Sequence, residues 1–295
     1  MTNDYQKVNT LINSSNGNLA FKVFSFKDNS SFDHLQRLNY YTIILINAGD
    51  GKLKADFAEY NFTKNTIMCF APYQPFMIET GKGISGFVIN FHPDFFCIHK
   101  HQKEVACNGV LFNDIYKPPF VILKQQDLEI FCSLFEQMKV EMKNVQLAQY
   151  ELLVSYLKIF LITASRLKVN QTPHAEQDFE DLKEPFILQN LKDAIEKNFK
   201  TKHTANDYAM LLNISSKALA KTTKLHFNKT LTDLISERII IEAKRELYLT
   251  SKTVKEIAYE LGYEDEHYFS RFFKINAEVS PQLFRETVGF ARAEA

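Results

Sequence analysis

Hydrophobic and polar positions follow two different periods along this chain. Between residues 20 and 91, short runs rich in β-branched and aromatic residues alternate with turn clusters. The clearest runs are Tyr40–Ile46, Thr66–Phe70 and Phe87–Phe91, and the clearest turns lie at 47–51 and 80–83. Many short strands at this spacing are typical of a β-sandwich or a small barrel. We therefore expect residues 1–126 to form a β-rich domain, either a sandwich or a small barrel.

From Asp127 the apolar spacing becomes helical. One apolar stripe ends near Met138, and a second runs from Leu147 to about Leu167. Two successive amphipathic helices form an antiparallel hairpin whose apolar face has to be covered. We assign residues 127–168 to such a hairpin and expect it to support dimerisation.

A polar segment separates this half of the chain from a helical C-terminal third. Residues 169–183 contain a proline and show no hydrophobic periodicity, which is typical of a linker. From Phe186 onward the pattern is helical, so residues 184–295 are assigned to an all-helical domain. The expected fold class is α+β with several domains, in which a β-rich domain and a helical hairpin precede an all-α domain.

The C-terminal third contains an internal repeat. Thr204-Ala-Asn-Asp207 and Thr253-Val-Lys-Glu256 are both capping boxes, in which a Thr hydroxyl caps the helix start and an acidic residue reaches back. The short helices that follow end at Asn213 and Gly262, two residue types that tolerate a left-handed backbone. A further helix follows each turn. The two predicted helix-turn-helix segments are residues 204–226 and 253–275.

One long helix is predicted between the two segments. Thr230–Leu249 begins with its own capping box, Thr230 with Asp233, and its ~20 residues span roughly 30 Å at 1.5 Å each. One turn of B-DNA is ~34 Å long. Two recognition helices joined in this way fit successive major-groove faces of a duplex.

The second segment carries the residues by which the chain resembles a known family. Val254-Lys-Glu-Ile-Ala-Tyr-Glu-Leu-Gly-Tyr-Glu-Asp-Glu-His-Tyr-Phe-Ser-Arg-Phe-Phe-Lys274 and Val279-Ser-Pro-Gln-Leu-Phe-Arg285 are similar to the DNA-binding domain of the AraC/XylS family of bacterial regulators. Glu237-Arg238-Ile239 and Ala243-Lys244 also match, and the resemblance covers residues 186–288. It implies a transcription regulator, usually an activator, that binds double-stranded DNA. It also implies a cupin-like N-terminal barrel that binds a small-molecule effector.

The same resemblance implies which side chains face DNA. The base-facing positions are Lys217, Ala220 and Lys221 in the first segment and His267, Ser270 and Arg271 in the second. The expected phosphate contacts are Lys224, Lys274, Ser215 and Thr253. The first segment departs from the family pattern, because Ala218 replaces an aromatic residue and Thr222-Thr223 replace an apolar pair. We expect the second segment to read bases and the first to add phosphate affinity.

Candidates for the effector pocket come from strand alternation alone, and each also fits plain core packing. They are Tyr41, Phe57, Phe70, Met77 and Phe87.

A metal-dependent cupin-type enzyme fused to the DNA-binding domain is the alternative function. The ligand-type residues near one another in the sequence are His92, Cys97, His99 and His101. A metal site needs convergent ligands with supporting partners, and the strand region offers His34 without a His-x-His pair. A methyl-acceptor repair fusion would use Cys97, but the Pro-Cys-His-Arg motif of that family is missing. We therefore expect no metal, no cofactor and no enzymatic activity.

Composition adds little to this interpretation. The 295 residues are 45% hydrophobic and carry zero net charge, so bulk electrostatics do not indicate nucleic acid. No apolar run reaches the ~20 residues that span a bilayer, and the N-terminus lacks a signal-like run. We expect a cytoplasmic homodimer with four reduced cysteines and no membrane association. RNA polymerase is a candidate partner.

Overall fold

The structure of the chain is a computed structural model. It describes residues 8–13, 17, 19–56, 58–81, 83–143, 146–171 and 186–288. The chain divides into two compact units, which are described separately. The barrel unit comprises residues 1–114 and 118–172, and the helical unit comprises residues 115–117 and 173–295.

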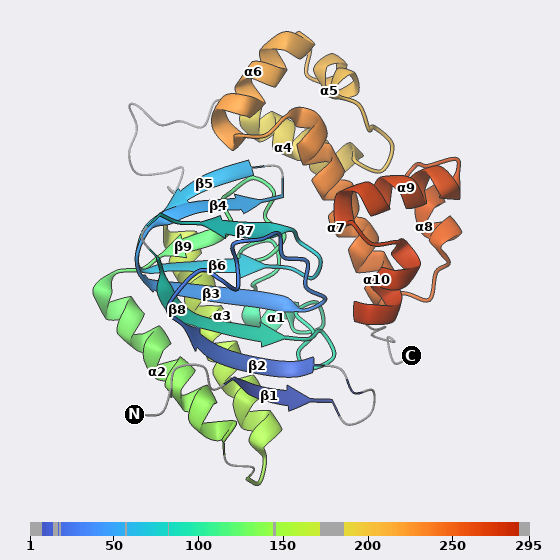
Figure 1. Cartoon of the computed structure of the whole chain (residues 1–295). Coiled ribbons are helices and arrows are strands. Elements are labelled where there is room, and N and C mark those ends of the chain that lie inside the picture. Colours follow the sequence, from blue (N-terminus) through green and yellow to red (C-terminus); the bar gives the residue numbers. More distant parts are fainter. Residues whose placement is uncertain are drawn as a thin grey trace. The chain divides into compact units, whose positions relative to one another are not determined.

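Two antiparallel sheets form the barrel unit (Figure 1). The six-stranded sheet has the order β1-β2-β8-β3-β6-β9 and the three-stranded sheet the order β5-β4-β7. The strands are β1 (Asn9–Ile12), β2 (Leu19–Phe26), β3 (Tyr41–Ala48), β4 (Gly51–Ala55), β5 (Ala58–Phe62), β6 (Thr66–Phe70), β7 (Phe76–Glu79), β8 (Ser85–Phe91) and β9 (Phe120–Ile122). The helices of this unit are α1 (Gln102–Val105), α2 (Gln125–Glu141) and α3 (Gln149–Gln171).

The central strands of the large sheet are apolar on both faces because each face covers a different core. In β3, Ile44 and Ile46 pack with Leu53, Phe76 and other residues of the small sheet. The alternate residues of β3 point to the opposite face, where α2 and α3 cover them. A strand that is buried on both faces reads as a continuous hydrophobic run, as Tyr41–Ile46 does.

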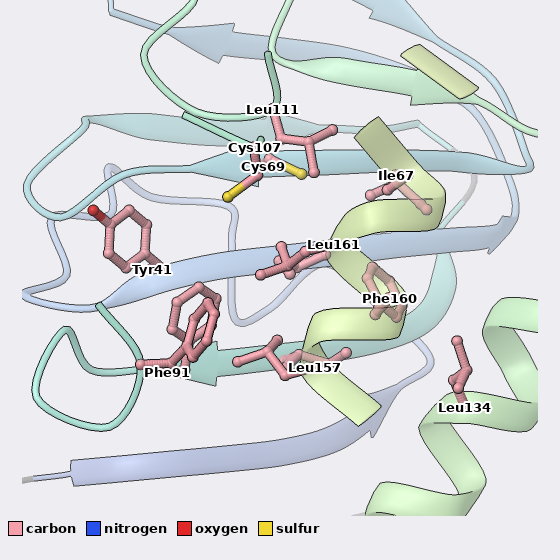
Figure 2. Close-up of a cluster of buried hydrophobic side chains, with 14 of the residues drawn as sticks. Tyr41, Ile67, Cys69, Phe91, Cys107, Leu111, Leu134, Leu157, Phe160 and Leu161 are labelled. Carbon is pink, nitrogen blue, oxygen red and sulfur yellow. The ribbon is translucent and has the colours of Figure 1, made fainter. Parts of the chain in front are cut away.

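The second core joins the large sheet to the helical hairpin. Figure 2 shows Leu157, Phe160 and Leu161 of α3 directed at the strands. Phe160 is fully buried, and its ring lies 4.6 Å from that of Phe131 on α2. This aromatic contact joins the two helices of the hairpin to each other, and the buried residues of α3 pack the hairpin on the sheet.

Seven helices make up the described part of the helical unit. They are α4 (Phe186–Asn198), α5 (Ala205–Leu211), α6 (Ser216–Phe227), α7 (Leu231–Leu249), α8 (Val254–Glu260), α9 (Glu266–Ala277) and α10 (Pro281–Val288). Helix α7 supplies buried residues on several of its faces, including Leu234, Ile240 and Leu247. The shorter helices pack around it.

The fold class predicted from the sequence, a β-rich domain with a helical hairpin followed by an all-α domain, is confirmed. Of the predicted linker 169–183, residues 169–171 belong to α3 and the others lie outside the described residues. None of the described helices combines the length and apolar character needed to cross a bilayer.

Replacing Phe160 by Ala should destabilise the barrel unit by about 3–5 kcal/mol, because it leaves a large cavity beneath α3. Leu35 lies in the same unit but outside the hairpin and is 42% exposed, so Leu35→Ala is a control that should cost well under 1 kcal/mol. Urea unfolding of both variants gives the comparison. Equal free energies of unfolding would show that α3 does not close this core.

Candidate nucleic-acid interface

Each helix-turn-helix begins with the capping box that the sequence predicts. The Thr204 hydroxyl accepts a hydrogen bond from the Asp207 N–H at 3.3 Å, and the Asp207 carboxylate accepts from the Thr204 N–H at 3.0 Å. Thr253 and Glu256 make the same exchange at 3.1 and 2.7 Å. These bonds satisfy backbone donors that a helix start otherwise leaves open, so they fix where α5 and α8 begin.

The two turns repeat each other in detail. Asn213 and Gly262 have φ values of 52° and 80°, the left-handed conformation expected at these positions. One residue later, the Ile214 N–H donates to the carbonyl of Ala209, and the Tyr263 N–H donates to the carbonyl of Ala258. The small Ala in each copy therefore receives the bond that closes the turn.

Helix α6 is the recognition helix of the first helix-turn-helix. Ser215 caps it by accepting from the Ala218 N–H, and its inner face buries Leu219 and Thr223. Although Thr223 departs from the family pattern, it is fully buried and its hydroxyl donates to the Ala220 carbonyl at 3.0 Å. That bond satisfies the polar group, so this helix seats tightly despite the substitution.

The predicted DNA-facing residues of α6 lie on its outer face. Lys217, Ala220 and Lys221 are exposed. Lys224 is also exposed, and its ammonium donates to the Asn228 carbonyl at 3.3 Å, at the end of the helix. No ion pair to Lys217 or Lys221 is found within the described part of the chain.

Helix α9 is the recognition helix of the second helix-turn-helix. Phe269 and Phe273 are fully buried beneath it, whereas His267 and Arg271 are exposed and Ser270 is half-buried. Lys274 is exposed one turn after Arg271. In the ranges that the structure describes, neither Arg271 nor Lys274 forms an ion pair.

A carboxylate at the start of α9 is used as a helix cap. One oxygen of Asp265 accepts from the N–H groups of His267 and Tyr268, at 2.6 and 3.0 Å. These backbone bonds lower the pKa of Asp265, so the cap is a fixed negative charge. The cap stabilises the helix by its interaction with the dipole, but its charge opposes an approaching phosphate.

Two predicted phosphate contacts are also helix caps. The Thr253 hydroxyl donates to Glu256 at 2.9 Å while accepting from its N–H, and the Ser215 hydroxyl accepts from Ala218. These hydroxyls are therefore already engaged in local bonds.

An ion-pair network ties α4 to α7. Arg238 donates to Glu196 at 2.7 Å and to Glu242 at 3.2 Å, and its guanidinium lies 3.9 Å from the centre of the Phe199 ring. Burial acts to raise the pKa of Glu242, but the neighbouring cations outweigh it and the pKa is lowered. Glu242 is thus held ionised where it can keep Arg238 in place.

The turn of the second helix-turn-helix touches the segment that leads into the first. A Cβ added at Gly262 would overlap the carbonyl oxygen of Lys200, and the His203 imidazole stacks on the Tyr263 ring at 4.7 Å. Burial lowers the pKa of His203. We call these four residues the turn contact. It is a second link, besides α7, between the two halves of the helical unit.

Helix α10 ties the second helix-turn-helix to the end of α7. The Arg285 guanidinium donates to the carbonyl of Leu247 at 3.1 Å and to that of Lys252. It therefore joins the end of α7 to the segment that leads into α8. The sequence places Arg285 in a family motif without giving it a role, and it gives no prediction of the turn contact.

The effector candidates are spread over different parts of the barrel unit. Phe70 lies in the core between the sheets, stacked on Phe76 at 3.9 Å. Tyr41 and Phe87 lie in the core beneath the helices. Met77 is half-buried between two inward-facing residues of β7, and Phe57 lies outside the described residues. The structure therefore does not gather these candidates into one pocket.

Two polar side chains lie in the large sheet where an apolar residue would be expected. Thr42 and Asn90 face each other across β3 and β8, and both are nearly fully buried. The Thr42 hydroxyl and the side-chain amide oxygen (Oδ1) of Asn90 have no hydrogen-bond partner among the described residues. Buried polar atoms of this kind can bond to a water or to a polar ligand.

The potential metal-ligand residues after β8 bond to different local partners. The His92 ring nitrogen accepts from the Asp94 N–H at 3.2 Å, the Cys97 sulfur from the Lys100 N–H at 3.4 Å, and His101 pairs with Glu104 at 2.9 Å. Among the residues that the structure describes, no three metal-ligand side chains, whether or not His99 is counted, lie close enough together to hold a metal ion.

Comparison with known proteins matches both units of the chain. Residues 208–287 match the family described as a helix-turn-helix domain, and residues 25–97 match the AraC-like ligand binding domain. The chain belongs to the AraC family of transcription regulators. In this AraC-family regulator, the matched segment 208–287 contains both recognition helices and the α7 helix between them.

Relatives of this AraC-family regulator include the HTH-type regulator YfiF of Bacillus subtilis, 23% identical over 260 residues that cover 85% of this chain and 78% of YfiF. A regulator from the cgkA 5' region of Pseudoalteromonas carrageenovora is 34% identical over 34% of this chain and 60% of its own length. Among solved structures, ToxT of Vibrio cholerae aligns with 92% of this chain and 99% of its own, at 15% identity and a TM-score of 0.39.

Replacing Gly262 by Ala should destabilise the helical unit by about 2 kcal/mol or more. An L-residue at this φ is strained, and its Cβ would push the Lys200 carbonyl out of the turn contact. Gly81→Ala is the matched control, since a Cβ there meets nothing within 4 Å. Guanidinium unfolding followed by circular dichroism at 222 nm compares the two. An unchanged midpoint for the Gly262 variant would contradict the turn contact.

Proposed function

We propose that this AraC-family regulator reads DNA bases mainly with α9 and gains phosphate affinity mainly from α6. The observation that carries this proposal is the exposure of Arg271 on a helix seated by two fully buried phenylalanines. An arginine on a rigid helix can donate both of its terminal N–H groups to a guanine edge in the major groove. His267 and Ser270 share the helix and are proposed as further base contacts, and Lys274 as a phosphate contact.

The outer face of α6 has a different chemistry. Lys217, Lys221 and Lys224 are its cations, and the predicted base-facing positions are Lys217, Ala220 and Lys221. Lysine acts as a flexible point charge that suits phosphates, and alanine can offer only an apolar contact to a thymine methyl. We therefore propose looser sequence preference for the first helix-turn-helix. Ser215 and Thr253 are proposed to contact phosphates through their exposed helix starts.

The barrel unit is proposed to sense a small-molecule effector. The family match to a ligand-binding domain supports this role, as do the unpartnered oxygens of Thr42 and Asn90 in the large sheet. Effector binding would shift the population between two arrangements of the regulator that differ in DNA affinity. Activation through RNA polymerase is the proposed outcome, and the protein is proposed to act in the cytoplasm.

A homodimer is proposed to form through the helical hairpin. The hairpin leaves apolar side chains exposed, among them Ile130 at 49%, Val140 at 56% and Ile159 at 47%. Burying such residues against a second hairpin would stabilise association.

The test of base reading compares two equivalent positions, Arg271 in α9 and Lys221 in α6. A binding site is first selected from a random duplex library with the full-length protein. Fluorescence anisotropy then gives affinities for the selected and a scrambled duplex. Arg271→Ala should lower the preference for the selected duplex by about tenfold or more, because a bidentate base contact is lost. Lys221→Ala should weaken both duplexes alike and reduce the salt slope by about 1.

Arg245→Ala is the control, since Arg245 lies on α7 and pairs with Glu242 and Glu246. It should leave the preference for the selected duplex unchanged. If Arg271→Ala kept the full preference while remaining folded, α9 would not be the base-reading helix.

The dimer proposal predicts a solution mass of twice the chain mass. Light scattering after size exclusion should give this value for the wild type, whereas Ile159→Asp should move the protein toward the monomer, because a buried unpaired charge opposes association. A wild-type protein that stays monomeric at tens of micromolar would contradict the dimer.

A further inference from the structure

Three residues from the connection between α1 and β9 form part of the helical unit. Residues 115–117 belong to that unit, although the chain before and after them belongs to the barrel unit. Ile115 is buried, and the Tyr116 ring lies 5.7 Å from that of Phe227, the last residue of α6. We call residues 115–117 the anchor segment, because they pack where the first recognition helix ends.

The Tyr116 side chain contacts α4 as well as α6. Its hydroxyl donates to Glu196 of α4 at 3.1 Å, and Glu196 also accepts from Arg238 of α7. The Lys192 ammonium lies 5.5 Å from the centre of the Tyr116 ring and 5.5 Å from that of Phe227. Burial and the nearby Glu196 carboxylate raise the pKa of Tyr116, so its phenol stays protonated and remains a donor.

A buried lysine bonds to the backbone of the same segment. Lys229 lies between α6 and α7, and its ammonium donates to the Glu237 carboxylate at 2.7 Å and to the Ile115 carbonyl at 3.2 Å. The side chains of Lys229 and Glu237 are only 4% and 7% exposed. A buried ion pair adds little net stability, because taking both charges out of water offsets their attraction. Stability alone therefore does not account for this lysine.

The internal repeat shows that the fold does not require a charge at this position. Asn228 and Glu278 end α6 and α9 in the same left-handed conformation, at φ values of 56° and 61°. The next residue is Lys229 in the first copy and the half-buried Val279 in the second. What distinguishes the first copy is the Ile115 carbonyl, which accepts a hydrogen bond from the lysine.

We propose that Lys229 fixes the anchor segment against the end of α6, and that this anchor holds the first recognition helix in the pose that contacts DNA. Lys229 is thus a positioning residue, since it acts through α6. The exposed lysines of α6 lie on the same rigid helix, so a change of tilt at its end displaces them from the phosphates. The inference rests on the phosphate contacts proposed for α6 and adds what sets the position of that helix.

The first test replaces both members of the buried pair, as Lys229→Met/Glu237→Leu. Replacing only the lysine would leave a buried carboxylate without its cation, whereas apolar residues of similar size at both positions are commonly tolerated. Hydroxyl-radical footprinting of the full-length protein on its selected duplex is the readout, and the window that Lys221→Ala weakens is assigned to α6. At saturating protein, protection of this window should fall below about half of that at α9, because the α6 lysines no longer meet phosphates.

Circular dichroism at 222 nm should show the helix content of the wild type, which separates a changed pose from an unfolded segment. Lys54→Met/Glu79→Leu is the matched control, since it removes the same two charges from an exposed pair on β4 and β7. It should leave both windows unchanged. Wild-type protection of both windows in the Lys229→Met/Glu237→Leu variant would overturn the proposal, and so would an equal loss of both.

A second variant leaves the buried pair intact. Tyr116→Ala removes the ring that packs against Phe227 at the end of α6. It should weaken the α6 window and spare the α9 window, as the double variant does. An α6 window as strong as in the wild type would show that the anchor segment does not position this helix.

A third measurement needs no DNA. Tetranitromethane nitrates tyrosine through its phenolate, so Tyr116 should react more slowly than Tyr259, which is 53% exposed on α8. In Lys229→Met/Glu237→Leu, the nitration rate of Tyr116 relative to Tyr259 should rise about threefold or more, because the segment opens more often. Peptide mass spectrometry gives both rates. An unchanged ratio would show that Lys229 does not hold the anchor segment.

The two levels of the account fail in different ways. A wild-type protein that shows no α6 window would overturn the proposed phosphate contacts of α6, and the positioning role with them. A wild-type α6 window that persists in both variants would overturn the positioning role alone.

Discussion

The DNA-reading geometry depends on how two small helix-turn-helix segments are seated on one helix. Each segment has too few residues to bury a core of its own, so its stability comes from the shared packing on α7. Helix α7 meets this need by burying residues on several faces. The turn contact between Lys200, His203, Gly262 and Tyr263 and the bonds from Arg285 then limit rotation of the segments about that helix.

The chain as a whole carries no net charge, so its electrostatics toward DNA depend on where the charged residues lie. Acidic residues cap the helix starts, where they interact favourably with the helix dipole, and the recognition helices place their cations on the outer face. At α9, helix capping by an acidic residue and attraction of phosphate conflict, since Asp265 is a fixed negative charge less than two helical turns before Arg271. This arrangement fits the base contacts proposed for α9, whereas the lysines on α6 fit the phosphate contacts proposed for that helix.

Local features of the helical unit could be predicted from the sequence because short-range rules decide them. The capping boxes at Thr204, Thr230 and Thr253 and the left-handed residues Asn213 and Gly262 are all found where the sequence predicts them. The turn contact could not be predicted, because it joins residues about sixty positions apart that follow no shared pattern. The left-handed turn already accounts for Gly at position 262, so this residue gave no sign that another backbone approaches there.

The effector candidates show a different limit of sequence analysis. Alternation along a strand separates its two faces, but it cannot tell which core each face covers when both are buried. Tyr41 and Phe87 therefore lie beneath the hairpin and Phe70 between the sheets.

The central claim is that the recognition helices α6 and α9, which are joined by α7, bind one face of a DNA duplex. Hydroxyl-radical footprinting of the full-length protein on its selected site tests it most directly. The account predicts two protected windows per protein chain, about 10 base pairs apart and on the same face of the DNA. A single window, or two windows on opposite faces, would contradict it.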